Sequence, residues 1–383
     1  MRREKLFGKE KRLWDDITRN LNVLLGGYHS YQRIIRWLKD MERQHPKIVT
    51  LLNIGNSAEG RAIYGLKLGT KSRRTKPVVW IDAGIHAREW VAVHTALYLI
   101  KQLIDEYYSN PKVTECLKLL DIYILPCLNP DGYEYTQSNP NNPSIRLWRK
   151  SRGSTLQYER QSGRYCQGVD LNRNFDFHFG ESGSSFSPCS NIYHGAYPFS
   201  EPETKLLIIS YRAVHDAILP LRRRIKAYLS LHTYSQLWIY PYSYAENKYS
   251  SDANDLIAVA HEAVNSIKKL YGTKYDYGTG PEVIYAFSGG SSDWVKQATS
   301  VKYSYIIELS PSKSSSNGFI VDKRELIPIG KEAYAGISVV IDKVITEAKQ
   351  KGGMFILLII CIFQVIQIIV IQIFWKINLD EKS

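Results

Sequence analysis

Four short, nearly continuous apolar runs recur along this chain, separated by longer stretches with helical periodicity. They cover residues 77–85 (PVVWIDAGI), 119–133 (LLDIYILPCLNPDGY), 225–234 (IKAYLSLHTY) and 301–310 (VKYSYIIELS). The second of them is expected to end in a Pro-Asp-Gly turn. Runs of this length and composition are typical of strands that are buried on both faces, as in parallel sheets. A sheet that is covered on both faces needs helices in two outer layers, so these runs constrain the fold strongly.

The stretches between the runs carry apolar residues at helical spacing. We expect helices within residues 28–46, 90–108, 200–216 and 252–272, the last of them closed by Gly272. Strands that alternate with helices indicate an α/β domain. The sequence therefore predicts a three-layer α/β/α fold with a mixed, mostly parallel, twisted central sheet.

Polar residues stand where each predicted strand ends. His86 and Glu89 follow the first strand, Asn129 follows the second, and His232 and Glu308 lie at the ends of the third and fourth. In open α/β sheets, sites form at the carboxyl ends of the strands. Catalytic zinc takes three protein ligands from His, Glu and Asp. The His-x-x-Glu spacing alone is a weak signal, because a hydrogen-bonded loop histidine is the commoner case.

The chain carries an excess of positive charge. Lys plus Arg number 50 against 37 Asp plus Glu, a formal net charge of +13 over 383 residues. Such an excess can indicate nucleic acid, an anionic membrane or an acidic substrate as partner. No block of like charge exceeds the RRR at 222–224, and no nucleic-acid-binding motif occurs. We therefore expect a solvated basic surface and no nucleic-acid partner.

The two ends of the chain differ from the rest. Residues 354–375 carry no charge and are long enough to cross a bilayer as a helix. Three glutamines within the segment weaken this interpretation, and translated non-coding sequence can look similar. A transmembrane anchor and an artefactual tail thus remain two open interpretations. Residues 1–27 are charged and lack the apolar core of a secretory signal peptide.

Seven segments together resemble the zinc metallocarboxypeptidases of the pancreatic A/B type. They are IDAGIHAREW, LPCLNPDGYEYT, RLWRKSR, GVDLNRNFD, LHTYSQLWIYPY, VIYAFSGGSSDW and YSYIIEL, in the family's order and close to its spacing. The resemblance implies that residues 28–349 form a catalytic domain with one Zn²⁺ per chain. It implies hydrolysis of the C-terminal peptide bond of peptides and proteins. We also expect a monomer. Residues 1–27 form a short N-terminal segment, for which a remnant of a pro-region is one open interpretation.

The resemblance implies roles for the residues at the strand ends. His86, Glu89 and His232 match the zinc ligands, and Asp170 matches the carboxylate that orients His86 from behind. Glu308 matches the general base, which takes a proton from the water that zinc activates and delivers it to the leaving amine.

A second set of residues is implied to bind the substrate. Arg149 matches the residue that polarises the scissile carbonyl and stabilises the oxyanion. Asn172, Arg173 and Tyr285 match a clamp on the free C-terminal carboxylate, which an arginine fork bonds bidentately. Such a clamp makes the enzyme an exopeptidase, because a mid-chain peptide bond has no carboxylate. Outer subsite contacts are implied for Arg88, Arg146 and Tyr234.

Ser292, directly before the Asp-Trp of SGGSSDW, is implied to form the floor of the side-chain pocket. A buried cation would lack a partner there, so we expect an A-type preference for apolar or aromatic C-terminal residues. Gly280 and Ser243 are expected to keep the pocket open, and Phe287 to narrow or line it. A B-type or acidic-residue preference remains an alternative. So does a catalytically impaired, peptide-binding relative.

The resemblance also pairs Cys166 with Cys189 in a disulfide that closes the loop holding Asn172 and Arg173. A disulfide implies an oxidising compartment. We therefore expect an extracellular, secreted protein, with a membrane-anchored form whose catalytic domain lies outside as the alternative. Cys127 lies in a predicted buried strand and is expected to be a free thiol.

Overall fold

The computed structural model describes residues 24–153, 156–160, 163–208, 218, 220–316 and 318–350. Its centre is an eight-stranded sheet with the order β1-β2-β4-β3-β7-β10-β8-β9. The strands are β1 (Val49–Asn56), β2 (Ala62–Leu68), β3 (Val78–Ala83), β4 (Asp121–Leu125), β7 (Ile225–Ser235), β8 (Leu237–Ile239), β9 (Asp276–Gly278) and β10 (Tyr303–Ser312). The four central strands, β4, β3, β7 and β10, are parallel to one another, whereas β2 and β8 run antiparallel to the central strands beside them.

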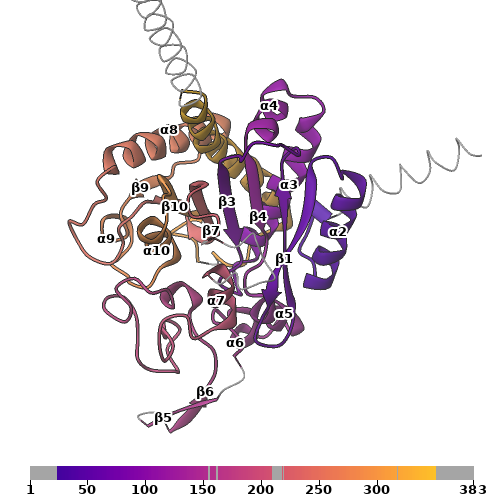
Figure 1. Ribbon diagram of the computed structural model, residues 1–383. Helices are drawn as coiled ribbons and strands as arrows, with labels where there is room; N and C mark the ends of the chain where they lie inside the picture. The colour runs from indigo at the N-terminus through magenta and orange to yellow at the C-terminus, as the bar shows by residue number, and fades with distance from the viewer. Residues whose placement is uncertain are drawn as a thin grey trace, which may run out of the picture.

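Helices cover both faces of this sheet, as Figure 1 shows. They are α2 (Tyr31–Gln44), α3 (Trp90–Tyr107), α4 (Pro111–Leu119), α5 (Pro130–Ser138), α6 (Pro143–Arg146), α7 (Pro202–Ile208), α8 (Ala253–Tyr271), α9 (Gly280–Val283), α10 (Ser291–Ala298) and a helix over residues 326–350. One hydrophobic core lies between the sheet and α2, α3, α4, α8 and the helix over 326–350, and a second lies between the sheet and α10. The predicted three-layer α/β/α fold is confirmed.

Strand β3 shows why its sequence is almost continuously apolar. Val79 and Ile81 belong to the first core, whereas Val78 and Trp80 point to the opposite face and belong to the second. Alternate side chains of a strand face opposite sides, so both faces of this strand are buried. Burying each such side chain stabilises the fold by about 1.5–3 kcal/mol. The end of β3, where the site begins, is therefore held firmly.

Two helix ends are capped in the structure, and one of them, at Gly272, was predicted. The side chain of Ser30 caps α2 by accepting a hydrogen bond from the backbone N–H of Arg33. Helix α8 closes at Gly272, whose φ of 78° is left-handed and whose N–H donates to the carbonyl of Lys268. A glycine adopts that conformation without the clash that a Cβ brings.

The segment NPDGY departs from the prediction. The sequence predicts a Pro-Asp-Gly turn after the second apolar run, but the structure has helix α5 beginning at Pro130. Proline is well suited to the first helical position, because its missing N–H would have no partner there. Asn129 caps the helix by accepting a hydrogen bond from the N–H of Gly132 at 2.9 Å.

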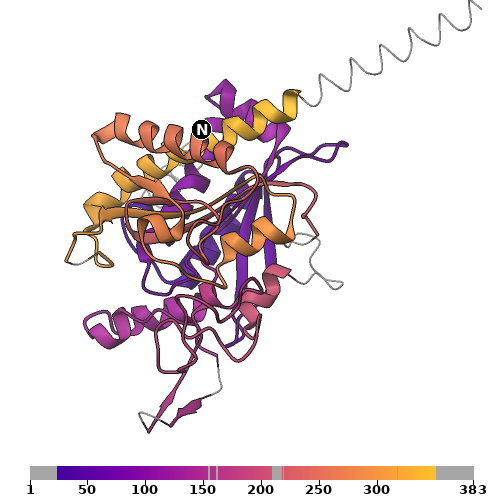
Figure 2. The ribbon, with the colours of Figure 1, turned by 90° about the vertical axis from the view of Figure 1, so that its left-hand side faces the viewer.

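A two-stranded hairpin of β5 (Gln157–Glu159) and β6 (Arg164–Cys166) projects from the body of the protein (Figures 1 and 2). Cys166 at its end forms a disulfide with Cys189, as expected. Cys127 is buried and free, also as expected, and Cys116 is in the same state. Within the described residues, no helix has the length and apolarity needed to cross a membrane. The apolar segment 354–375 lies outside the described residues.

Candidate metal centre and substrate site

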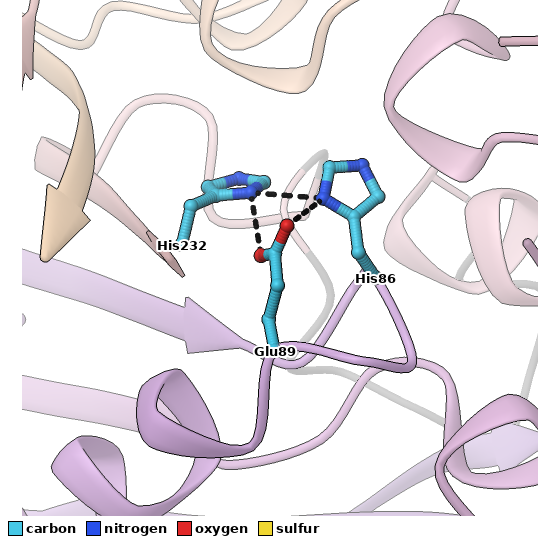
Figure 3. Close-up of side chains that lie close together, drawn as sticks. All are labelled: His86, Glu89 and His232. Carbon is cyan, nitrogen blue, oxygen red and sulfur yellow. Dashed lines mark hydrogen bonds and ion pairs between the residues drawn. The ribbon is translucent and has the colours of Figure 1, made fainter. Parts of the chain in front are cut away.

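His86, Glu89 and His232 converge at the carboxyl ends of two neighbouring strands, as Figure 3 shows. His86 and Glu89 lie in the turn after β3, and His232 lies within β7. Ala83 of β3 is paired with Leu231 of β7, so the turn after β3 begins beside His232. All three side chains are buried, and their ligand atoms lie within 4.8 Å of one another.

The hydrogen bonds of the two imidazoles decide which nitrogens face each other. Nε2 of His86 lies 3.2 Å from a carboxylate oxygen of Asp170, which can only accept, so Nε2 carries the proton. Nε2 of His232 lies 3.1 Å from the hydroxyl of Ser230, which itself donates to Asp82 at 2.7 Å. This Nε2 is therefore a donor as well. When both imidazoles are neutral, as metal binding requires, Nδ1 of each keeps its lone pair.

Four acceptor atoms consequently meet without a hydrogen between them. Nδ1 of His86 lies 2.7 Å from Oε1 of Glu89, Nδ1 of His232 lies 3.1 Å from Oε2, and the two Nδ1 atoms are 3.2 Å apart. Lone pairs at these distances repel one another unless a cation lies among them. Two imidazole nitrogens and a carboxylate are the donor set of a catalytic zinc site, so the residues present fit Zn²⁺.

The electrostatics of the three residues favour a cation beside Glu89, which can be a proton on His232 or a metal ion. Burial, together with Arg149, lowers the pKa of His86 and keeps its imidazole neutral. Burial also lowers the pKa of His232, but Glu89 outweighs it and raises that pKa. Burial raises the pKa of Glu89, but His86 and His232 overcome this and hold it far below its ordinary value. A buried, ionised carboxylate between two imidazoles attracts positive charge.

Asp170 connects the metal ligands to the substrate side of the site. Besides His86, its carboxylate accepts from the backbone N–H of Asn172 at 3.0 Å and from Nε of Arg149 at 2.9 Å. Burial raises its pKa, but Arg149 and Arg173 outweigh burial and hold the pKa well below its usual range. The carboxylate thus stays charged, and it orients His86 and Arg149 together.

The three residues of the predicted carboxylate clamp lie side by side. Nη2 of Arg173 donates to the hydroxyl of Tyr285 at 3.3 Å, and Nε donates to the carbonyl of Gly183 at 2.8 Å. The amide oxygen of Asn172 accepts from the N–H of Ser291 at 2.9 Å. Its NH₂ group is thereby directed away from Ser291 and stays available as a donor. Arg173 is buried, whereas Tyr285 is 47% exposed at the mouth of the site.

Glu308 is placed next to His232 by the sheet itself. The two residues are register partners on the parallel strands β10 and β7. The side chain keeps partial exposure to solvent, yet most of its surroundings are protein. Burial raises its pKa, and Glu89 adds to the rise while His232 and Arg149 oppose it, which leaves the pKa at about 7.

The predicted side-chain pocket is closely packed around Phe287. This ring is 5% exposed, shares an apolar cluster with Ile239 and Ile306, and lies 4.7 Å from the guanidinium of Arg173. A Cβ on Gly280 would come within 3.0 Å of the ring, so the glycine makes room for it. Ser292 and Ser243 are buried as well.

The outer contacts gather around Phe319. The guanidinium of Arg88 stacks on its ring at 4.1 Å, the ring of Tyr234 meets it edge-on at 5.0 Å, and Arg146 donates to its carbonyl. Arg146 also stacks on Trp90 at 3.7 Å. Phe319 was not among the residues that the sequence predicted for the site.

Ser230 and Asp82 are a second addition to the predicted set. Asp82 interrupts the apolar run of β3, is fully buried, and also accepts a hydrogen bond from Nε1 of Trp80 at 3.0 Å. A carboxylate inside a strand that is buried on both faces needs partners. A buried aspartate within this apolar run is the sequence signal for the hydrogen bonds that connect Asp82 through Ser230 to His232.

The sequence is similar to a known family of enzymes over most of its length. The family model described as Zinc carboxypeptidase matches residues 34–336. Carboxypeptidase B of Astacus astacus is 40% identical over 313 residues, which cover 82% of this chain and 95% of that protein. Carboxypeptidase A2 of Mus musculus is 38% identical over 343 residues, which cover 90% of this chain and 75% of that protein.

Two solved structures show the same fold. The crystal structure of thrombin activatable fibrinolysis inhibitor aligns with a TM-score of 0.74 and 36% identity, covering 84% of this chain and 75% of that one. The carboxypeptidase A from Helicoverpa armigera aligns with a TM-score of 0.73 and 32% identity, covering 85% and 75%.

Proposed function

The chain belongs to the zinc carboxypeptidase family, and from that premise we propose that it removes apolar or aromatic residues from the C-termini of peptides and proteins. The protein is an enzyme of this family, with Zn²⁺ as its cofactor. The observation that carries the proposal is the placement of a buried arginine, Arg173, near Asp170, whose carboxylate contacts the metal-ligating His86. A free carboxylate can be held there while the peptide bond next to it lies at the metal site.

Bound zinc supplies Lewis-acid chemistry, which polarises a carbonyl and makes water acidic enough to lose a proton near neutral pH. His86, Glu89 and His232 hold the metal in this proposal. Glu308 takes the proton of the attacking water on its carboxylate and passes it to the nitrogen of the leaving amine. A pKa of about 7 suits a group that must accept and then release a proton near neutral pH.

Arg149 stabilises the negative charge that develops on the carbonyl oxygen. Its guanidinium is buried, is fixed by Asp170 through Nε at 2.9 Å, and reaches within 3.9 Å of Glu89 through Nη1. A donor that is already held in place costs little reorganisation in the transition state. Asn172, Arg173 and Tyr285 bind the terminal carboxylate, and Arg88, Arg146 and Tyr234 contact the residues that precede the scissile bond.

Specificity follows from the pocket beside Arg173. Its proposed floor, Ser292, carries no charge, and Phe287, Ile239 and Ile306 form an apolar cluster next to it. A lysine or arginine side chain would meet no charge on this floor, and burying an unpaired cation costs several kcal/mol. A B-type preference remains the second candidate, because the similar proteins include one named Carboxypeptidase B.

The surroundings of the enzyme are proposed on the same basis. The disulfide between Cys166 and Cys189 favours an oxidising, extracellular location. We take residues 28–349 as the catalytic domain and expect it to act as a monomer on peptide C-termini.

The test is hydrolysis of peptides that differ only in their last residue. We expect kcat/KM to be highest for C-terminal Phe or Leu, lower for Arg and Glu, and abolished by a zinc chelator. A Phe peptide with an amidated C-terminus should not be cleaved, because it offers no carboxylate to Arg173. A dominant rate on Arg would establish the B-type alternative. Cleavage of the amidated peptide would contradict the carboxylate clamp.

A further inference from the structure

A groove of about 510 Å³ lies at the edge of the sheet opposite the metal centre. It is formed by the loop over residues 69–77 between β2 and β3, by the neighbouring surface of β1 and β2, and by Asp121 and Arg224. Asp121 and Arg224 stand at the starts of β4 and β7, which pair with the start of β3. Six residues of β3 separate this edge from the turn that holds His86, a distance of about 20 Å.

The lining of this basic groove is strongly cationic. Seven of its fourteen residues are Lys or Arg, and only Asp121 is acidic. Asp121 is already neutralised, because Nζ of Lys76 lies 3.0 Å from one of its oxygens and Nη2 of Arg224 lies 2.7 Å from the other. The groove therefore keeps a large net positive charge.

Five of the cations have no acidic partner within the described part of the chain: Lys47, Lys67, Lys71, Arg73 and Arg74. Lys47 and the three cations of the loop are exposed, and Lys67 is partly exposed. Like charges that are gathered in one groove repel each other and raise the free energy of the unbound protein. A polyanion that lies along the groove relieves this repulsion and releases its own counter-ions.

We propose that this basic groove binds a sulfated polysaccharide. The uncharged lining favours this class of polyanion over others. Hydroxyl groups of Thr50, Ser72 and Thr75 stand among the cations and can donate to sulfate oxygens. The lining contains no aromatic side chain, whereas sites for single-stranded nucleic acid stack bases on aromatic rings. It also contains no large apolar side chain of the kind that inserts into a membrane interface.

The position of the groove has a consequence for the enzyme. A polysaccharide that is bound at the amino ends of the central strands leaves the carboxyl ends, and so the metal centre, open to peptides. We expect binding to hold the enzyme on an extracellular matrix without inhibiting it. This inference does not depend on which C-terminal residue the enzyme prefers.

The test compares two variants with equal loss of charge. One is K71Q/R73Q/R74Q, which removes three exposed cations of the groove loop. The matched control is K268Q/K269Q/K274Q, which removes three exposed cations at and just beyond the end of α8. Binding to heparin, as the probe, is measured by calorimetry at several NaCl concentrations, and peptidase activity serves as the measure of folding.

We expect the groove variant to bind heparin at least about tenfold more weakly. The slope of log Kd against the logarithm of the NaCl concentration should fall by about 3. The control should stay within about twofold of the unaltered protein, and both variants should keep full peptidase activity. Chemically desulfated heparin should bind weakly to all three proteins. Equal weakening in both variants would overturn the proposal, because net charge alone would then explain binding. Binding of double-stranded DNA or phosphatidylserine vesicles as tight as that of heparin, and lost in the groove variant, would overturn the assignment of the ligand.

Discussion

Single hydrogen bonds determine which atoms the site presents to a cation. Asp170 behind His86, and Ser230 with Asp82 behind His232, fix the proton of each imidazole on Nε2. If either partner were lost, the proton of the ring could move from Nε2 to Nδ1, and Nδ1 could then no longer bind the metal. Residues that never touch the metal therefore control its affinity.

The Ser230→Ala variant tests this at one atom. It removes the acceptor for Nε2 of His232 and leaves Asp82 with one donor fewer. We expect zinc affinity to fall by about 10–100-fold, with kcat at saturating zinc changed much less. Competition with a fluorescent chelator measures the affinity. Ser304→Ala is the control, because that serine is equally buried on β10 but bonds the carbonyl of Ser292. Similar losses in both variants would show a general packing effect.

The His86→Ala variant tests the ligand set itself. Removing one of three ligands leaves an incomplete donor set, and Asp170 loses one of its hydrogen-bond donors but keeps Asn172 and Arg149. We expect less than about one-hundredth of the peptidase activity and no bound zinc when zinc and protein are mixed in equal amounts. The far-ultraviolet circular dichroism spectrum should be unchanged. His261→Ala, at an exposed position of α8, should retain zinc and activity. If the His86 variant kept its activity, the proposed zinc site would be wrong.

The Phe287→Ala variant tests how the pocket is bounded. The ring fills space next to Arg173 and Gly280, so its removal should enlarge the pocket. We expect the ratio of kcat/KM for C-terminal Trp over Ala to rise about tenfold, together with a loss of about 3–5 kcal/mol of stability. Gly280→Ala should act in the opposite direction, because its Cβ would press on Ser243 and on the ring. An unchanged ratio in both variants would place the pocket elsewhere.

At the scale of elements, the sequence predicted the strands and the residues at their ends better than the links between them. Apolar runs that are buried on both faces identify β3, β4, β7 and β10, and the polar residues that follow mark the site. The sequence could not predict that Ser230 lies opposite Asp82, because strand register is set by pairing and not by local composition. Helix α5 was missed for a related reason, since Pro-Asp-Gly suits both a turn and a helix start.

The side chain of Asn129 connects helix α5 to the turn that holds His86. Its side chain caps the helix through Gly132 and donates to the carbonyls of Ile85 and Lys150 at 3.2 and 3.0 Å. Asn129→Ala removes a cap worth about 1 kcal/mol and leaves two buried carbonyls with fewer partners. We expect the free energy of unfolding to fall by about 3 kcal/mol in urea titrations.

Asn110→Ala provides the matched control for this element. Asn110 caps α4 in the same way, accepting from the N–H of Lys112 at 3.1 Å, but it is only half-buried. Its loss should cost about 1 kcal/mol. Equal costs at the two positions would mean that Asn129 acts only as a helix cap and does not join α5 to the site.

At the scale of the whole molecule, the two ends of the central strands have different charge. Metal ligands and carboxylates gather at the carboxyl ends, and unpaired cations gather at the amino ends. The net charge of +13 predicted a solvated basic surface, but it could not show that residues distant in sequence, such as Lys47, Arg73 and Arg224, share one groove. Their proximity depends on strand order, which composition does not contain.

Overall stability should depend on pH through Glu203 of α7, which docks against the turn between β1 and β2. One oxygen of its carboxyl accepts the N–H of Ala58 at 3.0 Å, and the other has no partner within the described residues. Burial raises the pKa of Glu203 to about 7, and nearby Glu201 and Asp131 add to the rise. The ordinary value is 4.5.

A raised carboxyl pKa gives a definite sign to the pH dependence. Between pH 4.5 and 7 the folded state holds this proton and the unfolded state has released it, so stability falls as pH rises through that window. The Glu203→Gln variant is neutral at all pH values and lacks this loss. As pH rises from 4.5 to 8, we expect the free energy of unfolding of the variant to increase relative to that of the unaltered protein, by an amount that approaches about 3 kcal/mol. Urea titrations of both proteins across this range measure the difference, with the exposed Glu246→Gln as the control that should follow the unaltered protein. A difference that stayed constant with pH would mean that Glu203 is ionised in the folded protein.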